Sequence, residues 1–235
     1  MIKDDWLSSI LGLSCYKTIV QDIADYSKEI EISNPPQTHL ITIYTKKPFS
    51  SQNCFSRPGL RYIQQMNQYR WKESSVTYEF NTELIRFYTK SDIPEILEIS
   101  KNAFSKSRFH QDSRIGFEVA EKIKQEWILA NLTVRENAIT FVSKNSIGQI
   151  NGFNSILIQD DRLIIDLIAV ASEYRGQGIG RSLILKCQEL SASSGKPVFV
   201  GTQADNPAIR LYESLGFSPN KVSYVWHDFH VSSSL

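Results

Sequence analysis

The chain has 235 residues, a formal net charge of +1 and 11% aromatic residues. This length can bury a sizeable core, in one large domain or in smaller parts. The balanced charge argues against a nucleic-acid or anionic-membrane surface, and the apolar run at residues 10–13 is too short to span a membrane. Cys15, Cys54 and Cys187 are widely spaced without a CxxC pair. They indicate reduced thiols in the cytoplasm rather than a disulfide framework or a zinc site.

Residues 1–82 predict a small N-terminal α/β domain. Segments 40–45 and 76–80 alternate like strands, and Pro35-Pro36 and Arg57-Pro58-Gly59 interrupt the pattern. This part contains no glycine-rich loop of its own. It is interpreted either as a small cap domain or as a truncated relative of the part that follows.

Residues 83–235 predict a second domain with more regular patterning. A helix start at Ser91-Asp92-Ile93-Pro94-Glu95 follows a first strand, and a polar, basic loop at 105–114 precedes a second helix that buries Ala120, Ile123, Trp127 and Ala130. Strands are expected at 84–88, 139–142, 149–158, 162–170, 198–202 and 223–229. With a helix after 180 and another after 206, the order is β-α-α-β-β-β-α-β-α-β, an α+β sandwich around a mixed sheet.

A glycine-rich turn follows the apolar strand that ends at Val170. Three glycines in five positions, Gly176, Gly178 and Gly180, let the backbone turn tightly and bring its N–H groups to a ligand. A helix starting there adds unpaired N–H donors and a partial positive charge, which together suit a pyrophosphate. A P-loop is excluded because Gly195-Lys196 is followed by Pro197. The glycine spacing also fails the dinucleotide fingerprint.

A second pattern lies at residues 206–217. Asn206 suits a helix N-cap, Pro207 the first helical position and Gly216 the C-terminal stop. Between them the apolar residues recur at helical spacing and form one stripe that includes Tyr212. A core tyrosine would occupy the same position.

The two patterns together resemble the GNAT superfamily of acyl-CoA-dependent N-acyltransferases, and the element order above is the one known for the GNAT fold. The resemblance implies a coenzyme A pyrophosphate cradle made of Arg175, Gly176, Gln177, Gly178, Ile179, Gly180 and Arg181. It further implies contacts with the coenzyme at Ile168, Ala169, Val170, Asn206 and Tyr212. The co-substrate is then acetyl-CoA, and no four-ligand cluster calls for a catalytic metal.

Acyl transfer also requires groups that handle protons and charge. The thioester oxygen needs a donor, for which free N–H groups at Ala169 or Val170 are candidates. Tyr212 is expected to donate a proton to the leaving thiolate, since its ordinary pKa of ~10 keeps it protonated at neutral pH. Asp166 and His110 are candidate bases for the attacking amine. A water-relayed transfer, with Asp166 serving only as a paired strand carboxylate, stays open.

The loop at 107–114 bears on the acceptor. Ser-Arg-Phe-His-Gln-Asp, with Glu126-Trp127-Ile128 downstream, looks like the TDP-fucosamine acetyltransferase branch. That resemblance implies a nucleotide-linked deoxyamino sugar as acceptor, contacted by Arg108, Phe109, His110 and Asp112. The alternatives are a solvated loop with Phe109 in the core, a GNAT enzyme for another amine (antibiotic, amino acid, peptide or protein N-terminus), and a non-catalytic acyl-CoA-binding module. We expect a cytoplasmic protein without nucleic-acid or membrane partners, and a homodimer stays open.

Overall fold

The computed structural model describes residues 1–49, 57–71, 84–101 and 103–231. The strand expected at 76–80 and Cys54 lie outside the described residues. The chain forms two compact units, each built from separate segments of sequence. The first consists of Met1–Asn67, Lys106–Ile123 and Val222–Leu235, and the second of Gln68–Ser105 and Lys124–Lys221. The predicted domain division between residues 82 and 83 stays a prediction.

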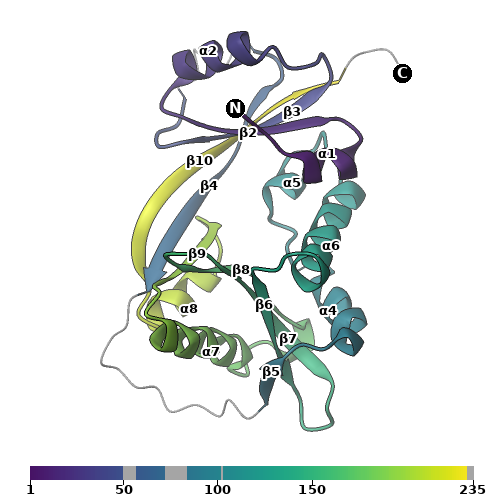
Figure 1. Cartoon of the computed structure of the whole chain (residues 1–235), viewed down its shortest axis with the longest axis vertical. Coiled ribbons are helices and arrows are strands. Elements are labelled where there is room, and N and C mark those ends of the chain that lie inside the picture. Colours follow the sequence, from purple (N-terminus) through teal and green to yellow (C-terminus); the bar gives the residue numbers. More distant parts are fainter. Residues whose placement is uncertain (50–56, 72–83, 102, 232–235) are drawn as a thin grey trace. The chain divides into compact units, whose positions relative to one another are not determined.

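The helices and strands are labelled in Figure 1. The helices are α1 Asp5–Leu11, α2 Ile23–Ser33, α4 Ile93–Ser100, α5 Arg108–Gln111, α6 Phe117–Thr133, α7 Ile179–Ser194 and α8 Ala208–Ser214, with short 3-10 turns η1 Lys90–Asp92 and η2 Ser172–Tyr174. The strands are β1 Ile2–Lys3, β2 Ser14–Val20, β3 His39–Thr45, β4 Leu60–Trp71, β5 Ile85–Phe87, β6 Ala138–Lys144, β7 Ile150–Ile158, β8 Leu163–Val170, β9 Val198–Gln203 and β10 Ser218–His230.

In the first unit the strand order is β1-β2-β3-β10-β4. β2 and β3 run parallel, and β10 pairs antiparallel with β3. α2 begins after Asp22, whose carboxylate accepts the N–H of Asp25 as an N-cap. Its Tyr26 is fully buried with Ile41, Ile43 and Trp226 in the core of this unit.

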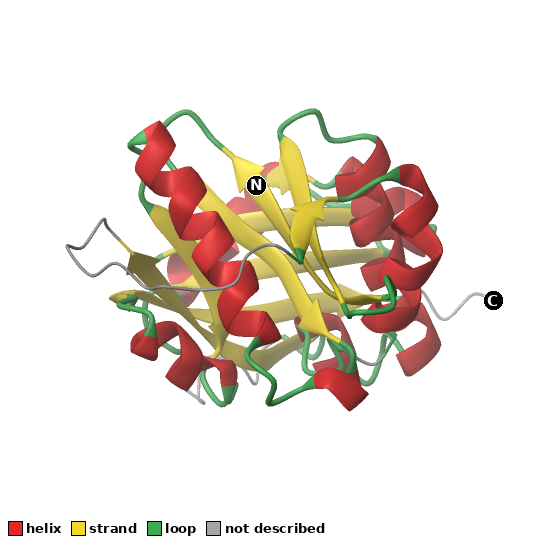
Figure 2. Ribbon diagram, turned by 90° about the horizontal axis from the view of Figure 1, so that it is seen from below, coloured by secondary structure: helices red, strands yellow, loops and turns green. Residues whose placement is uncertain are grey.

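In the second unit the order is β9-β8-β7-β6-β5. β5 to β8 are antiparallel neighbours, and β8 and β9 are parallel. One core cluster joins this sheet to α7 and α8, and a second lies with α4 and α6. Helices therefore cover both faces of these strands, with α7 and α8 on one side and α4 and α6 on the other (Figure 1). Figure 2 shows the helices of the chain in red and the strands in yellow. The mixed, mostly antiparallel α+β fold expected from the sequence is confirmed.

The predicted elements differ from the structure mainly at their ends. The helix expected to run to Phe104 ends at Ser100, and the segment expected as a loop contains the short helix α5. Ser107, in extended conformation, precedes α5, and Phe109 within it is fully buried. A fully buried aromatic side chain fixes the helical turn here, although the polar sequence around it is typical of a loop.

β8 is the element that positions the site. Ser155 of β7 faces Leu167, but the next residue, Ile156, faces Ile165. Asp166 is therefore the extra residue of a β-bulge, which reverses the facing of the side chains that follow it. Leu163 and Ile165 pack toward α7, whereas Leu167 and Ala169 pack toward α4 and α6.

Beyond the bulge, β8 also parts from its parallel neighbour. β9 pairs with β8 at Leu163, Ile164 and Ile165. The remaining residues of both strands lie outside this pairing, so an open edge runs along the end of β8 toward the glycine loop. Free N–H groups at Ala169 or Val170, the candidates named from the sequence, require an open edge of this kind.

Candidate functional site

The glycine loop connects η2 to the N-terminus of α7. Gly176 has φ 76° and Gly178 has φ 82°, and a Cβ atom at either position would meet open space. Both conformations lie in the left-handed region, where glycine is unstrained and a side chain is not. The predicted turn is therefore present, with Gly178 as the N-cap of α7.

The start of α7 provides hydrogen-bond donors. The Ser182 N–H makes a helical hydrogen bond to the Gly178 carbonyl at 3.0 Å. The N–H groups of Ile179, Gly180 and Arg181 precede this bond, so they have no acceptor within the helix. Together with the helix dipole they form a site suited to an anion. Residues that fit a pyrophosphate are thus in place.

A pocket of about 650 Å³ opens beside this loop. One wall is the loop and the first turn of α7, and the other is the turn between β6 and β7. Its lining includes Lys144, Asn145, Asn151, Tyr174, Gln177 and Ser182. Asn145 ties the two walls together, because its amide donates to the Tyr174 hydroxyl at 3.0 Å. Sequence reasoning missed this wall, since a short Asn/Gly turn carries no mark of ligand binding.

The structure distinguishes the two backbone N–H groups, of Ala169 and Val170, that the sequence offers as donors to the thioester oxygen. The Ala171 N–H donates to the Asn151 carbonyl on β7 at 3.0 Å. Because backbone groups alternate in direction along an antiparallel ladder, the N–H of Val170 points away from β7, toward the open edge. The Val170 carbonyl points the same way and accepts from Arg175 Nε at 3.2 Å. The geometry favours Val170 over Ala169.

The second pattern folds as a capped helix. α8 begins at Ala208, one residue later than predicted, and the Asn206 Oδ1 accepts the Ala208 N–H at 2.9 Å. The Asn206 amide donates to Thr202 Oγ1 at 2.7 Å, which anchors it to β9. Gly216, with φ 82°, ends the helix as expected.

Tyr212 of α8 lies in the core cluster shared by α7 and the sheet and is 3% exposed. Its ring lies 5.7 Å from that of Phe217. Burial raises the pKa of Tyr212 to about 12, so the hydroxyl is protonated throughout the neutral range. This environment is compatible with both interpretations offered above, a proton donor and a core tyrosine.

Asp166 is engaged by its neighbours. Its Oδ2 accepts the Trp127 indole N–H and the Asn131 amide, each at 2.7 Å, and Arg135 lies 3.8 Å away. The carboxylate is 11% exposed. All three contacts fall on Oδ2. They favour the paired strand carboxylate, because they tie the side chain to α6 and to Arg135.

His110 is held at both ring nitrogens. Nδ1 lies 2.8 Å from Ser107 Oγ, and Nε2 lies 2.8 Å from Glu121 Oε1. Its side chain is 2% exposed. A histidine with both nitrogens occupied and almost no exposure is suited to holding α5 and α6 together rather than to taking up a substrate proton.

The other acceptor candidates also make contacts within the first unit. Phe109 is fully buried, with the Arg108 guanidinium 4.2 Å from its ring centroid. Asp112 is 2% exposed and accepts a bidentate hydrogen bond from Arg114 at 2.7 and 2.8 Å. The geometry favours the alternative in which Phe109 fills the core and leaves Arg108 as the remaining acceptor candidate.

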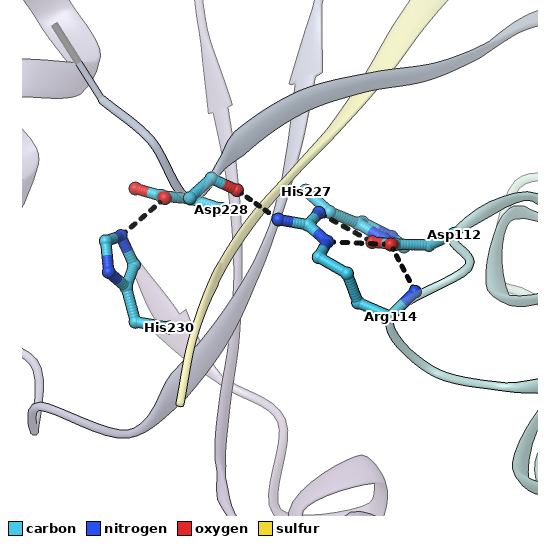
Figure 3. A network of polar contacts seen from close by, with 6 residues as sticks. Asp112, Arg114, His227, Asp228 and His230 are labelled. Carbon is cyan, nitrogen blue, oxygen red and sulfur yellow. Dashed lines mark hydrogen bonds and ion pairs between the residues drawn. The ribbon is translucent and has the colours of Figure 1, made fainter. Parts of the chain in front are cut away.

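Asp112 and Arg114 belong to a buried network drawn in Figure 3. Asp112 Oδ2 also lies 2.9 Å from His227 Nδ1. Burial alone would raise the pKa of Asp112, but the hydrogen bonds from His227 and Arg114 outweigh it and hold that pKa below its usual range. Burial lowers the pKa of His227, so the ring is neutral and donates, while Arg114 supplies the countercharge.

The family model for "Acetyltransferase (GNAT) family" matches residues 94–217, just over half of the chain. The matched range contains the glycine loop, the diverging strands and Tyr212. The chain therefore belongs to the GNAT acetyltransferase family, and the family predicted from the sequence is confirmed.

One curated relative is the spore coat polysaccharide biosynthesis protein SpsD of Bacillus subtilis (strain 168). It is 35% identical over 138 residues, which cover 58% of this chain and 47% of that protein. The match thus spans about half the length of the curated relative.

Two solved structures show the fold at low identity. A functionally unknown conserved protein of Staphylococcus epidermidis ATCC 12228 has TM-score 0.65 and 14% identity, over 93% of this chain and 85% of its own. A putative GNAT acetyltransferase of Novosphingobium aromaticivorans DSM 12444 has TM-score 0.58 and 18% identity, over 83% and 76%. Among the described residues, no helix has both the length and the apolar character required to cross a membrane.

Proposed function

We propose that this protein transfers an acetyl group from acetyl-CoA to the amine of a nucleotide-linked deoxyamino sugar. The observation that best supports acetyl-CoA as the acetyl donor is the glycine loop at the start of α7. There Gly178 caps the helix, and three N–H groups lack an acceptor within the helix. Arg175 and Arg181 flank these groups with positive charge. The pyrophosphate of the coenzyme fits this arrangement of backbone and charge.

The thioester would lie along the open edge between β8 and β9. There the Val170 N–H is directed toward the space that β9 leaves, where it can stabilise the negative charge that develops on the thioester oxygen. Tyr212 would donate a proton to the departing thiolate, for which its protonated state at neutral pH is required. Acyl transfer then forms the amide bond and breaks the carbon–sulfur bond in a direct attack by the amine.

The attacking amine must lose a proton. The hydrogen-bond partners of Asp166 and His110 argue for roles in positioning rather than proton transfer. A sugar amine is less basic than a lysine amine, so water can accept the proton without a dedicated base. We therefore propose the water-relayed transfer.

The sugar acceptor has separate support. SpsD carries the name of a spore coat polysaccharide biosynthesis protein, and the 35% identity over 138 residues exceeds that of the two solved structures above. The sequence at Ser107–Asp112 resembles the acetyltransferases of nucleotide-linked amino sugars. Because acetyl-CoA and nucleotide sugars are cytoplasmic metabolites, we propose the cytoplasm as the site of the reaction.

The test is thiol release from acetyl-CoA over a panel of nucleotide-linked 4-amino and 3-amino deoxysugars, aminoglycosides, amino acids and peptides. We expect turnover with at least one nucleotide-linked amino sugar and an N-acetyl product identified by mass. Turnover confined to peptides or aminoglycosides would contradict the sugar acceptor. Coenzyme binding without turnover on any amine would instead favour a non-catalytic acyl-CoA-binding module.

Replacing Gln177 with Glu tests the pyrophosphate cradle by charge alone. Gln177 is exposed in the loop, and its amide donates weakly to the Glu173 carbonyl at 3.3 Å. A carboxylate this close to a pyrophosphate costs on the order of 1 to 2 kcal/mol, so KM for acetyl-CoA should rise about 10-fold. Steady-state kinetics at two salt concentrations measure this rise, which salt should reduce.

The matched control is Gln159→Glu, an exposed position in the turn at the other end of β8. It adds the same charge away from the loop and should leave KM for acetyl-CoA unchanged. Equal effects from the two variants would mean that the glycine loop does not hold the pyrophosphate.

A further inference from the structure

A cluster of two histidines and one aspartate lies in the first unit, apart from every residue assigned above. His39 begins β3, and Asp228 and His230 lie two residues apart near the end of β10. In the antiparallel pairing His39 lies directly opposite His230. Because residues i and i+2 of a strand share a face, all three side chains project from the same side of the sheet.

The donor atoms of these side chains converge. One ligand atom from each of the three residues lies within 4.8 Å of the others. His230 Nε2 is 2.8 Å from Asp228 Oδ1, and the two imidazole centroids are 4.9 Å apart. Ligand atoms around a tetrahedral zinc ion are separated by about 3.3 Å, given bonds of about 2.0 to 2.1 Å. Small rotations of the rings would reach that arrangement.

One ring nitrogen of His39 is unpaired within the described part of the chain. His39 is 8% exposed, and its Nδ1 lies 2.6 Å from the Pro36 carbonyl, which fixes the proton on Nδ1. The Nε2 lone pair is consequently buried, and it has no hydrogen-bond partner among the residues that the structure describes. A buried unpaired acceptor calls for a physical reason, and metal coordination is one. A histidine whose other nitrogen donates to a carbonyl is also the usual form of a metal ligand.

Neighbouring groups shape the cluster. The Tyr26 hydroxyl donates to Asp228 Oδ2 at 2.7 Å, which leaves Oδ1 directed at His230, as Figure 3 shows for the aspartate and histidine. Arg57 lies 3.9 Å from Oδ2 and partly offsets the negative charge. A Cβ on Gly59 would fall 2.4 Å from His230 Nε2 and 2.6 Å from Asp228 Oδ1. Glycine at position 59 therefore keeps the space at the two donor atoms clear.

We propose that His39, Asp228 and His230 bind a divalent transition-metal cation, with zinc as the best match. Two imidazoles and one carboxylate are ligands that zinc prefers, and three protein ligands leave a fourth position for water. The His230 side chain is 39% exposed, which gives that position access to solvent. The site joins the ends of β3 and β10 and takes no part in the acetyl transfer proposed above.

The experiment is zinc binding by the full chain, measured by competition with a chromophoric chelator and by metal analysis after gel filtration. We expect about one zinc per chain. His39→Gln and His230→Gln should each lower the affinity for zinc at least 10-fold. Tyr26→Phe, which removes the hydroxyl that orients Asp228, should weaken binding by about 10- to 100-fold. Cobalt in place of zinc should give the visible absorption of a four-coordinate ion.

The control is His110→Gln, which removes a histidine of the same unit that lies outside the cluster and should keep the full zinc affinity. Circular dichroism verifies that each variant is folded. Should His39→Gln fail to fold, His230→Gln decides, because its partly exposed side chain tolerates replacement. Folded wild-type protein that binds no zinc, or variants at residues 39 and 230 that bind as well as wild type, would overturn the proposal and leave a hydrogen-bonded His/Asp cluster.

Discussion

Replacing Tyr212 with Phe is expected to lower kcat about 100-fold or more, with KM for acetyl-CoA nearly unchanged. The substitution removes one hydroxyl from a side chain that is 3% exposed and keeps the ring that packs near Phe217. In the proposed site the coenzyme cradle is built from backbone at the start of α7, so we expect the affinity for acetyl-CoA not to depend on this hydroxyl. In the proposed mechanism the departing thiolate would lose its proton donor, and this would raise the energy of the transition state without changing the binding of acetyl-CoA.

Steady-state kinetics with the best acceptor of the panel provide the measurement. Tyr69→Phe is the matched control, since Tyr69 is 5% exposed in the same core cluster and lies outside the proposed site. It should leave kcat within about twofold of wild type. An unchanged kcat in Tyr212→Phe would remove this tyrosine from the mechanism and assign it to the core.

Replacing Asp166 with Ala is expected to lower the free energy of unfolding by about 2 to 4 kcal/mol, because one buried and one partly buried donor lose this acceptor at about 1 to 3 kcal/mol each. These donors are the Trp127 indole N–H and the Asn131 amide, both 2.7 Å from the carboxylate. The fraction that folds should retain kcat within about threefold. Urea unfolding and kinetics on the same preparation measure the two effects separately.

Asp161→Ala serves as the control, because Asp161 is 65% exposed and paired with Arg162 in the turn before β8. Because solvent screens an exposed pair of this kind, its removal should leave the free energy of unfolding nearly unchanged. If Asp166→Ala instead left stability unchanged and abolished turnover, Asp166 would be the general base, and the water-relayed transfer would be wrong.

The sequence predicted the fold of residues 84–230 well because its signals there are local. The glycines at 176, 178 and 216 adopt the left-handed conformations that their spacing indicates. Helix and strand periodicity placed α6, α7 and β6 to β9 within a few residues. These features depend on near neighbours in the chain, so one sequence is enough to recognise them.

The parts that the sequence did not reveal depend on distant neighbours. The side of β8 on which Asp166 lies could not be predicted, because it is set by a bulge opposite Ser155 and Ile156. The partners of Asp112 include His227, which is 115 residues away. His39 and His230 become neighbours through strand pairing alone, and no spacing rule connects residues so far apart.

The first unit is assembled from three separate segments of the sequence, and this affects how the chain folds during synthesis. Its segments are residues 1–67, 106–123 and 222–235, so the whole second unit is translated before the last strand of the first arrives. β3 has β10 as a sheet neighbour, and until β10 leaves the ribosome that edge is open to other chains. The second unit contains residues 68–221 except for one insertion and can form earlier. The first unit is therefore completed late. A chain that stalls before residue 222 exposes the edge of β3 that β10 would cover.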